Sequence, residues 1–317
     1  MSRTFYMQQC CMQKHLRFMH HDVLIIGGSY AGLSAAMALG RARRNVLIVD
    51  SGQPCNRQTP HSHNFLTRDG EKPAEIARIA WEQVSAYPTV ARESGIIVRV
   101  SPAPGGFEAG SDTGTLYTSR KLILAYGVKD HLPAIPGFAD SWGITTLHCP
   151  YCHGYEVHSR PLGIFGNGDV IYEFTKLLTG WSNDLRLLTN GPATLTPEQR
   201  QELERHGIPV IEHELAAIAP APEGQELRFA NGDSVSVAAL FARVQVTLPN
   251  ILAQELGCEL TPAGLILVDE MRRTNVPGVY AAGDATTPMR SVAAAVASGM
   301  MAAAMLNHEL AGEDFAR

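Results

Sequence analysis

The sequence predicts an α/β protein with two nucleotide-binding-type units, and three features lead to this prediction. Two segments, starting at Asp22 and at Pro161, follow the order of short apolar strand, Gly-rich turn, helix and strand. This order is typical of the dinucleotide-binding βαβ unit. A third segment, 274–284, ends an apolar strand in Gly-Asp just before a long helix of small residues. The chain has 317 residues, which is long enough for two such domains.

The first unit has a strong dinucleotide-binding pattern. Residues 22–26 are short, apolar and ended by glycines, which favours a buried parallel strand. A helix is expected to about Arg43, then a strand at 45–49 that leads into Asp50, an acid placed to accept from a ribose hydroxyl. The residues expected to surround the nucleotide are Gly27, Gly28, Ser29, Tyr30, Ala31, Gly32, Asp50 and Ser51. Ser29 replaces the usual middle glycine of the turn but is small.

The second unit has a weaker pattern. Its strand, 161–165, leads to Gly166 and Gly168, and a helix to about Thr179 and a strand at 185–188 follow. The third glycine position holds Ile171, although close packing of helix on strand favours a small residue there. At the offset of Asp50 this unit has Thr189, and the next arginine downstream is Arg200. Two interpretations stay open: the unit binds NAD(P)H through other residues, or it only carries the cysteines described next.

The stretch 148–156, HCPYCHGYE, holds the Cys149–Cys152 pair. Six cysteines in the chain are too few for a disulfide scaffold, so a Cys-x-x-Cys indicates redox or metal chemistry. A zinc site of the two cysteines with His148 and His153 has suitable ligand types, but ligands so close in sequence surround one ion poorly. A glutaredoxin-type site would instead follow the first strand of a small domain.

Composition excludes several classes of function. The net charge of −5 and the lack of a basic stripe argue against a nucleic-acid partner. No apolar run reaches the length of about 18 residues that a membrane helix needs, and no secretory signal is evident. We therefore expect a cytoplasmic protein without a membrane partner, in which residues 1–18 are a tail or a start-site artefact.

Four landmarks in order resemble the low-molecular-weight thioredoxin reductases, within the FAD-dependent pyridine nucleotide-disulfide oxidoreductases. They are residues 27–32 with Asp50, residues 122–127, the Cys149–Cys152 pair, and residues 281–284. The resemblance covers about residues 21–310. It implies two Rossmann-like domains of three-layer ββα type, the second inserted into the first. The FAD-binding domain would be 1–127 and 246–317, and the NAD(P)H-binding-like domain would be 128–245.

The resemblance also implies FAD as cofactor, a homodimer and a large rotation between the domains. The further residues expected at a cofactor are Gly127, Gly283, Asp284, Arg290, Ser291, Gly166 and Gly168. The strand end at Asp284 and the helix start near Ser291 suit a pyrophosphate or a polyol. Tyr126 stands where the family usually has Thr. Two histidines, His61 and His63, lie in a loop that either binds cofactor or assists proton transfer near the Cys pair.

By the same resemblance, Cys152 would face the flavin and Cys149 would exchange with the substrate. His153 replaces the usual Asp acid/base, and a histidine titrates nearer neutrality, so we expect it to give and take a proton. With the following Gly-Tyr-Glu, it is similar to a subgroup that includes the gliotoxin-type dithiol oxidases. We also expect that Cys55 lies near the cofactor, and that Cys258, Cys10 and Cys11 are incidental.

Three functions stay open. The first is a thiol–disulfide oxidoreductase that passes electrons from NAD(P)H through FAD and the Cys pair to a thioredoxin-like protein or a small disulfide. The second is an oxidase that passes electrons from a small dithiol to oxygen without NAD(P)H. The third is a non-enzymatic flavin redox sensor. The intact Cys pair favours the first, whereas Ile171, Thr189 and His153 favour the second.

Overall fold

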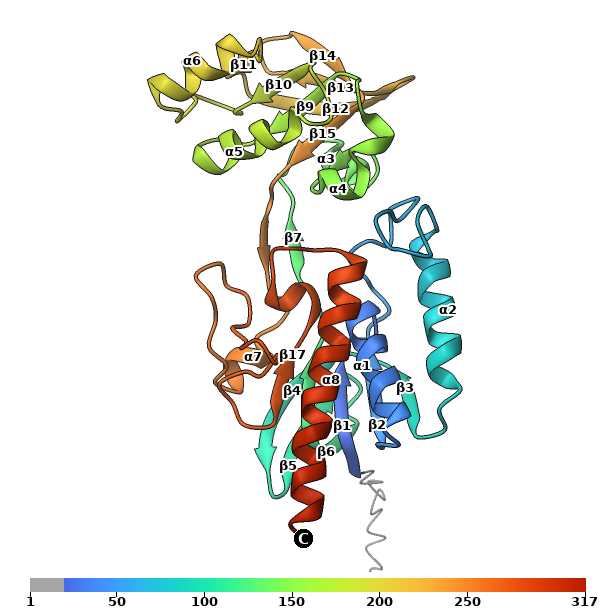
Figure 1. Cartoon of the computed structure of the whole chain (residues 1–317). Coiled ribbons are helices and arrows are strands. Elements are labelled where there is room, and N and C mark those ends of the chain that lie inside the picture. The colour runs from blue at the N-terminus through green and yellow to red at the C-terminus, as the bar shows by residue number, and fades with distance from the viewer. Residues whose placement is uncertain (1–19) are drawn as a thin grey trace, which may run out of the picture.

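The computed structural model describes residues 20–317, which form two α/β units joined by a thin connection (Figure 1). The connection is a pair of short antiparallel strands, β7 (Lys129–His131) and β16 (Gln245–Thr247). We call residues 20–128 with 248–317 the large unit and residues 132–244 the Cys unit. The predicted tail, 1–18, and Cys10 and Cys11 lie outside the described residues.

The large unit is built on a sheet in the order β3-β2-β1-β6-β5-β4, with β17 beside β6. Its strands are β1 (His20–Ile26), β2 (Val46–Asp50), β3 (Val90–Ser94), β4 (Ile97–Ala103), β5 (Gly106–Ser111), β6 (Leu116–Leu124) and β17 (Val279–Ala281). The pairs among β1, β2, β3, β6 and β17 are parallel, and β4 and β5 extend the sheet as an antiparallel hairpin.

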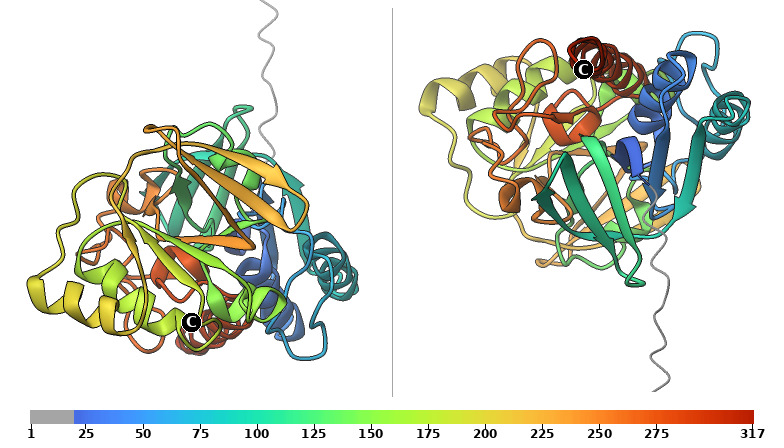
Figure 2. Two further views of the ribbon diagram at one scale, coloured as in Figure 1. Left: turned by 90° about the horizontal axis from the view of Figure 1, so that it is seen from above. Right: turned by 90° about the horizontal axis from the view of Figure 1, so that it is seen from below.

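Both faces of this sheet are covered, because successive strand residues point to opposite sides. Val23 and Ile25 pack with α1 (Tyr30–Arg41), α2 (Pro73–Ser85) and α8 (Val292–Phe315). Leu24 and Ile26 pack in a second core with the hairpin and α7 (Leu252–Glu255). The 3-10 turn η2 (Gly283–Thr286) connects β17 toward α8. Figure 2 shows α1 and α8 side by side.

The Cys unit has a parallel sheet in the order β11-β10-β9-β15-β8. Its strands are β8 (Thr146–Leu147), β9 (Leu162–Phe165), β10 (Leu185–Leu188), β11 (Val210–Ile211) and β15 (Ala239–Ala242). Helices α5 (Asp169–Leu178) and α6 (Pro197–Arg205) share one core with it. The antiparallel strands β12 (Leu215–Ala221), β13 (Gly224–Phe229) and β14 (Ser234–Val237) pack in the other. Short helices α3 (Phe138–Ser141), α4 (Pro150–His153) and η1 (Tyr155–Val157) complete the unit.

The predicted elements occur where the sequence places them, with small shifts at their ends. The α/β class and both strand–turn–helix–strand patterns are confirmed by these sheets. The first helix ends at Arg41 rather than near Arg43, and the strand at 185–188 is β10. The last helix starts after Ser291, as predicted. Within residues 20–317, no helix is both long and apolar enough to cross a membrane.

Candidate functional site

A cavity lies between the two units and holds about 1100 Å³ of empty space, including its opening to solvent. Residues of the large unit line it together with Cys152 and His153 of the Cys unit. The other predicted site residues in its wall are Ser29, Tyr30, Ala31, Gly127, Gly283, Asp284, Arg290 and Ser291. Cys149 is absent from this wall, as are Gly27, Gly28, Gly32, Asp50 and Ser51. The tertiary structure thus brings one sulfur of the pair to the predicted cofactor residues.

The first Gly-rich turn leaves no room for side chains at its glycines. A Cβ at Gly32 would lie 1.9 Å from the carbonyl oxygen of Gly27, and one at Gly27 would lie 2.5 Å from that of Ala125. Gly27 also has φ +102°, which glycine adopts readily. The tight turn starts α1 at the cavity, and Ser29 in the N-cap position makes no side-chain cap. The first amides of α1 therefore have no side-chain acceptor and suit an anion.

Asp50 ends β2 beside the turn. Its Oδ1 accepts a hydrogen bond of 3.0 Å from the Gly28 amide, and its Oδ2 lies 2.5 Å from Nη2 of Arg92. The Arg92 guanidinium lies over the Trp81 ring, 5.4 Å from its centroid. No local pattern in the sequence points to Arg92, because its partner lies on a neighbouring strand far along the chain. Ser51, which follows Asp50, is exposed.

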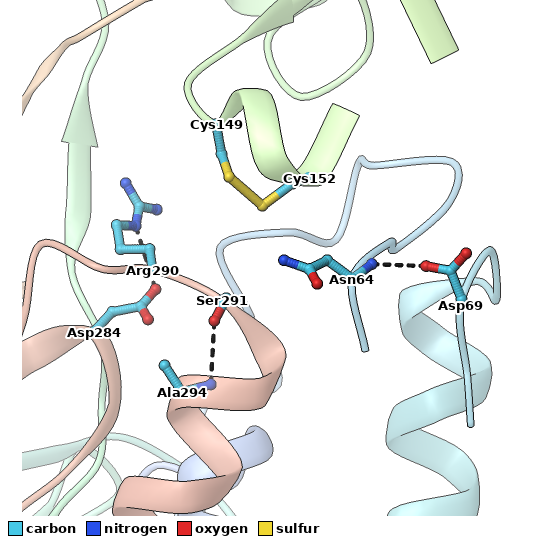
Figure 3. Close-up of a disulfide and its surroundings, with 8 residues drawn as sticks. All are labelled: Asn64, Asp69, Cys149, Cys152, Asp284, Arg290, Ser291 and Ala294. Carbon is cyan, nitrogen blue, oxygen red and sulfur yellow. Dashed lines mark hydrogen bonds and ion pairs between the residues drawn. A yellow bond between two sulfur atoms is a disulfide. The ribbon is translucent and has the colours of Figure 1, made fainter. Parts of the chain in front are cut away.

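The C-terminal landmark forms a second wall of the cavity (Figure 3). Ser291 caps α8 by accepting a hydrogen bond from the Ala294 amide at 3.1 Å. The Arg290 guanidinium lies 3.3 Å from Oδ2 of Asp284 and also contacts Asp130. Burial raises the pKa of the Asp284 carboxyl, and Arg290 opposes that shift.

Cys55 lies in the same wall, as expected for a loop residue near a cofactor. Its sulfur is 3.7 Å from Oδ2 of Asp284. Burial and the nearby Asp284 raise the pKa of this thiol to about 11, so it is protonated at neutral pH. Cys258, by contrast, is buried in a core of the large unit.

Cys149 and Cys152 form a disulfide at a one-turn helix, α4, with Cys149 in the N-cap position. Figure 3 shows Cys152 on the side nearer to Ser291. A helix of one turn aligns few peptide dipoles, so α4 stabilises a thiolate at Cys149 only weakly.

Both histidines beside the pair are held neutral. Burial lowers the pKa of His153 to about 4, although Glu156 opposes the shift. Burial and Arg290 lower the pKa of His148 to about 4 as well. We expected His153 to titrate near neutrality. This expectation is wrong, because removal of the side chain from water disfavours its charged form. At neutral pH His153 is therefore unprotonated, and it is a weaker base than a free imidazole.

The loop histidines differ in their placement. His63 lines the cavity, with Nε2 3.5 Å from Oε1 of Glu156 and Nδ1 3.7 Å from Oδ1 of Asp69. His61 is exposed, and its Nδ1 lies 2.9 Å from the carbonyl oxygen of Gly70. Of the two histidines that the sequence singles out, the structure therefore brings His63 to the Cys pair's cavity.

The second Gly-rich turn is filled by its own side chains. Ile171 is buried and lies 2.6 Å from where a Cβ of Gly166 would be. The Gly168 amide donates to Oδ1 of Asn167 at 2.9 Å, and this oxygen also accepts from the Thr194 amide at 2.9 Å. The Gly168 amide, which would face a pyrophosphate, already donates to the Asn167 side chain. Gly166 and Gly168 therefore do not form an open anion site here.

The end of the neighbouring strand offers no acceptor to a ribose either. Thr189 is 3% exposed and its hydroxyl donates to the carbonyl oxygen of Gly191 at 2.7 Å. Arg200 does reach this loop, where it contacts the Ala193 carbonyl oxygen and forms an ion pair with Glu212. Arg200, the next arginine downstream of Thr189, is therefore paired with an acid of the same unit.

The cavity at the first turn fits FAD. Nε2 of His148, a buried atom of a residue in its wall, has no hydrogen-bond partner among the described residues. Buried polar groups are ordinarily paired, so such an atom suits a bound group. Asp284 offers an acceptor for a polyol, and the amides at the start of α1 offer donors for a pyrophosphate. Among residues 20–317, no cluster of three His, Cys, Asp or Glu side chains could hold a metal ion.

Known proteins resemble the chain over nearly its whole length. The pyridine nucleotide-disulphide oxidoreductase family matches residues 21–299. Thioredoxin reductase sirT of Leptosphaeria maculans is 30% identical, with 93% of this chain and 96% of that protein covered. Thioredoxin reductase tcpT of Claviceps purpurea is 31% identical, with 91% and 94% covered. The crystal structure of an oxidoreductase from Agrobacterium tumefaciens is 38% identical, covers 92% of this chain and 99% of its own, and has a TM-score of 0.87.

These matches agree with the geometry of the cavity and of the Cys pair beside it. The chain belongs to the pyridine nucleotide-disulphide oxidoreductase family and is an FAD-dependent thiol–disulfide oxidoreductase of the thioredoxin-reductase type.

Proposed function

We propose that Cys149 and Cys152 carry electrons between FAD in the cavity and a disulfide or dithiol substrate outside it. The observation that carries this proposal is the position of the disulfide. Cys152 is part of the cavity wall that Ser29, Asp284 and Ser291 also form, whereas Cys149 is outside that wall. One sulfur thus faces the cofactor side, and the other is left for exchange with a substrate.

The exchange balances as two successive displacements. In the oxidising direction, a substrate thiolate attacks the sulfur of Cys149, and the Cys149–Cys152 bond breaks to leave Cys152 as a thiolate. The second substrate thiolate then closes the substrate disulfide and releases Cys149 as a thiolate. Two electrons remain on the pair, and two protons leave the substrate. In the reducing direction the same bonds change in reverse.

The chain's residues would divide the remaining tasks. FAD, when bound, supplies two-electron redox chemistry that the side chains lack. His153, which lies beside the pair and is unprotonated at neutral pH, would relay a proton there and not hold it. The turn from Gly27 to Gly32 and Asp50 hold the nucleotide part of the cofactor, while Asp284 holds its polyol. Ser29, Tyr30, Ala31, Gly127, Arg290 and Ser291 complete the wall.

We extend the proposal to organisation. An FAD-binding domain of 1–127 and 246–317 with an inserted domain of 128–245 is supported by the separate sheets and cores of the two units. A homodimer is supported by the resemblance to thioredoxin reductases. A cytoplasmic location is supported by the Cys-x-x-Cys itself, since a reducing compartment keeps such pairs in exchange.

The direction of electron flow has two candidates. A reductase would take electrons from NAD(P)H and pass them to a thioredoxin-like protein or a small disulfide. An oxygen-dependent dithiol oxidase is the second candidate, and the self-filled turn of the Cys unit favours it. There Asn167 occupies the Gly168 amide, Ile171 packs over Gly166, and Thr189 replaces the ribose acid.

An anaerobic titration tests both candidates. The purified FAD-loaded protein is mixed with NADPH, with NADH, and with a small dithiol such as dithiothreitol, and the visible flavin absorbance is followed. Bleaching by micromolar nucleotide supports the reductase. Bleaching by the dithiol alone, with recovery in air, supports the oxidase. A flavin that no dithiol bleaches, in a protein that also reduces no disulfide, contradicts the proposed role of the Cys pair.

A further inference from the structure

Asp130 lies on β7, one of the two strands that join the units, and its side chain points into the cavity wall. Its Oδ1 is 2.6 Å from Nη1 of Arg290, and its Oδ2 is 3.3 Å from Nη2. Both side chains are 11% exposed. A charged pair this well buried is held only while both partners are present, because either charge alone would be poorly solvated.

Asp130 also contacts the Cys unit. The indole nitrogen of Trp142 donates to Oδ2 of Asp130 at 3.2 Å. The Trp142 ring stacks on Phe138 and lies 6.0 Å from the ring of His148, the residue before Cys149. One carboxylate therefore connects the start of α8 to the aromatic support of the Cys pair.

The Arg290 guanidinium connects this contact to the cofactor side of the cavity. It lies between Asp130 and Asp284, so that one cation serves two carboxylates. Asp284 is the residue that the proposed function assigns to the polyol of FAD. A change at Asp130 therefore alters the contacts of Arg290, while Arg290 keeps one buried acidic partner.

The two units have few other covalent or sheet connections among the described residues. β7 and β16 pair over three residues, and no other strand pair joins the sheets of the units. Because the strand pair that joins the units is only three residues long, the placement of Cys152 at the cavity depends on side-chain contacts. The contacts of Asp130 are buried and charged, so they are stronger than exposed ones.

We propose that Asp130 is a positioning residue, which holds Cys152 at the cofactor cavity by binding Arg290 of the large unit and Trp142 of the Cys unit at the same time. This inference rests on the proposed function, in which the Cys pair must meet both the cavity and an external substrate. Loss of either contact of Asp130 lets the Cys unit move away from the cavity more often.

The test is the reactivity of the reduced cysteines in Asp130→Asn. The FAD-loaded protein is reduced without oxygen by a phosphine and treated with iodoacetamide, and alkylation of Cys149 and Cys152 is followed by mass spectrometry. We expect Cys152 of the variant to react about tenfold faster, since a charge-assisted contact is lost. The variant should keep its FAD and fold, because Arg290 retains Asp284.

Two further variants make the result specific. Asp140→Asn is the matched control, since Asp140 is exposed in the same Cys unit and its variant should react like wild type. Trp142→Phe keeps an aromatic ring but removes the indole N–H donor, so it should raise the rate about threefold. Effects of Asp130→Asn and Trp142→Phe that add fully in the double variant would contradict a shared contact.

Unchanged alkylation of Cys152 in Asp130→Asn would overturn the inference, as would an equal increase in the Asp140→Asn control. A misfolded variant would lose FAD and alkylate Cys258 as well, and Trp142→Phe then decides alone. The measurement does not depend on turnover. If wild type neither oxidises dithiols nor reduces disulfides, the proposed function fails, while the alkylation rates still test the role of Asp130.

Discussion

The two Gly-rich turns follow the same order of strand, turn and helix, but their amides meet different partners. At the first turn, the Gly28 amide donates to Asp50 of the next strand, and the start of α1 lines a cavity. At the second, the Gly168 amide donates to Asn167 within the turn itself. In the second turn, a side chain of the turn itself is the acceptor for the Gly168 amide, whereas the first turn leaves room for a ligand.

This difference shows what a Gly-rich pattern does and does not determine. The glycines fix the backbone path from strand to helix, since both turns contain residues with positive φ. Whether the turn binds a nucleotide depends on the residues around it. Asp284 and Ser291, contributed by the far end of the chain, line the same cavity as residues 29–31 of the first turn.

The Cys pair gives the largest test of this comparison, because it connects the second unit to the cavity of the first. Cys152→Ser should lower thiol–disulfide turnover by at least about a thousandfold, since serine cannot form the disulfide. Flavin content should stay near that of wild type, because the cofactor is expected to contact the large unit. Turnover is measured with dithiothreitol in air and with a small disulfide plus NADPH. Near-normal rates with both would show that the pair is not on the electron path.

Two glycine substitutions, one in each turn, test the comparison. Gly32→Ala places a Cβ 1.9 Å from the Gly27 carbonyl oxygen and should cost about 3 kcal/mol of stability and abolish FAD binding. At Gly168, φ +80° would strain an alanine by about 1 kcal/mol. Its Cβ would lie 3.3 Å from Oγ1 of Thr194, which is a much longer contact than the one at Gly32. Urea unfolding and flavin content measure both. Loss of FAD in Gly168→Ala would break the comparison.

Acidic pH should destabilise the folded protein through the two histidines that the Cys unit contributes to the cavity. Burial lowers the pKa of His148 and of His153 from 6.5 to about 4, so the unfolded chain binds more protons between these values. Stability therefore falls as the pH drops from 6.5 toward 4, by up to about 1.4 kcal/mol per pH unit for each histidine. Urea unfolding at pH 5 and 7 measures this, and His153→Asn should make the loss smaller. An equal loss in the variant would show that His153 does not titrate in this range.

The smallest effect is expected from opening the second turn. Asn167→Ala removes the side chain that occupies the Gly168 amide, and should tighten NADPH binding about threefold. Asp50→Asn is the opposite control, since it should weaken FAD binding about tenfold and leave NADPH binding unchanged. Titrations of tryptophan fluorescence with NADPH and of apoprotein with FAD give the two constants. Strong NADPH binding by wild type would show that the second turn works as the first does.

Much of the fold could be predicted, because its elements are local. The strands at 22–26 and 185–188 are short apolar runs bounded by turn residues, and the structure forms β1 and β10 there. The helix start at Ser291 follows from a capping residue before a run of small residues. Of the loop residues that the sequence marked, His63 and Cys55 reach the cavity, while His61 stays outside its wall.

The lowered pKa of His153 could not be inferred from its neighbours in sequence. Its pKa depends on burial between the two units, which only the folded chain produces. The same holds for Arg92 and Asp130, whose partners are far away along the chain. Residues that act through such distant contacts carry no local pattern that would single them out.

The sequence by itself determined the two strand–turn–helix units, the Cys pair and the position of Asp50 at the end of the second strand, since each depends on spacing within one segment. Only the tertiary structure decided that the Asn167 side chain accepts from the Gly168 amide in the second turn, and that Asp130 connects Arg290 to Trp142. The physical reason is that a local pattern sets the path of the backbone, whereas solvation and hydrogen-bond partners are set by segments that meet only on folding.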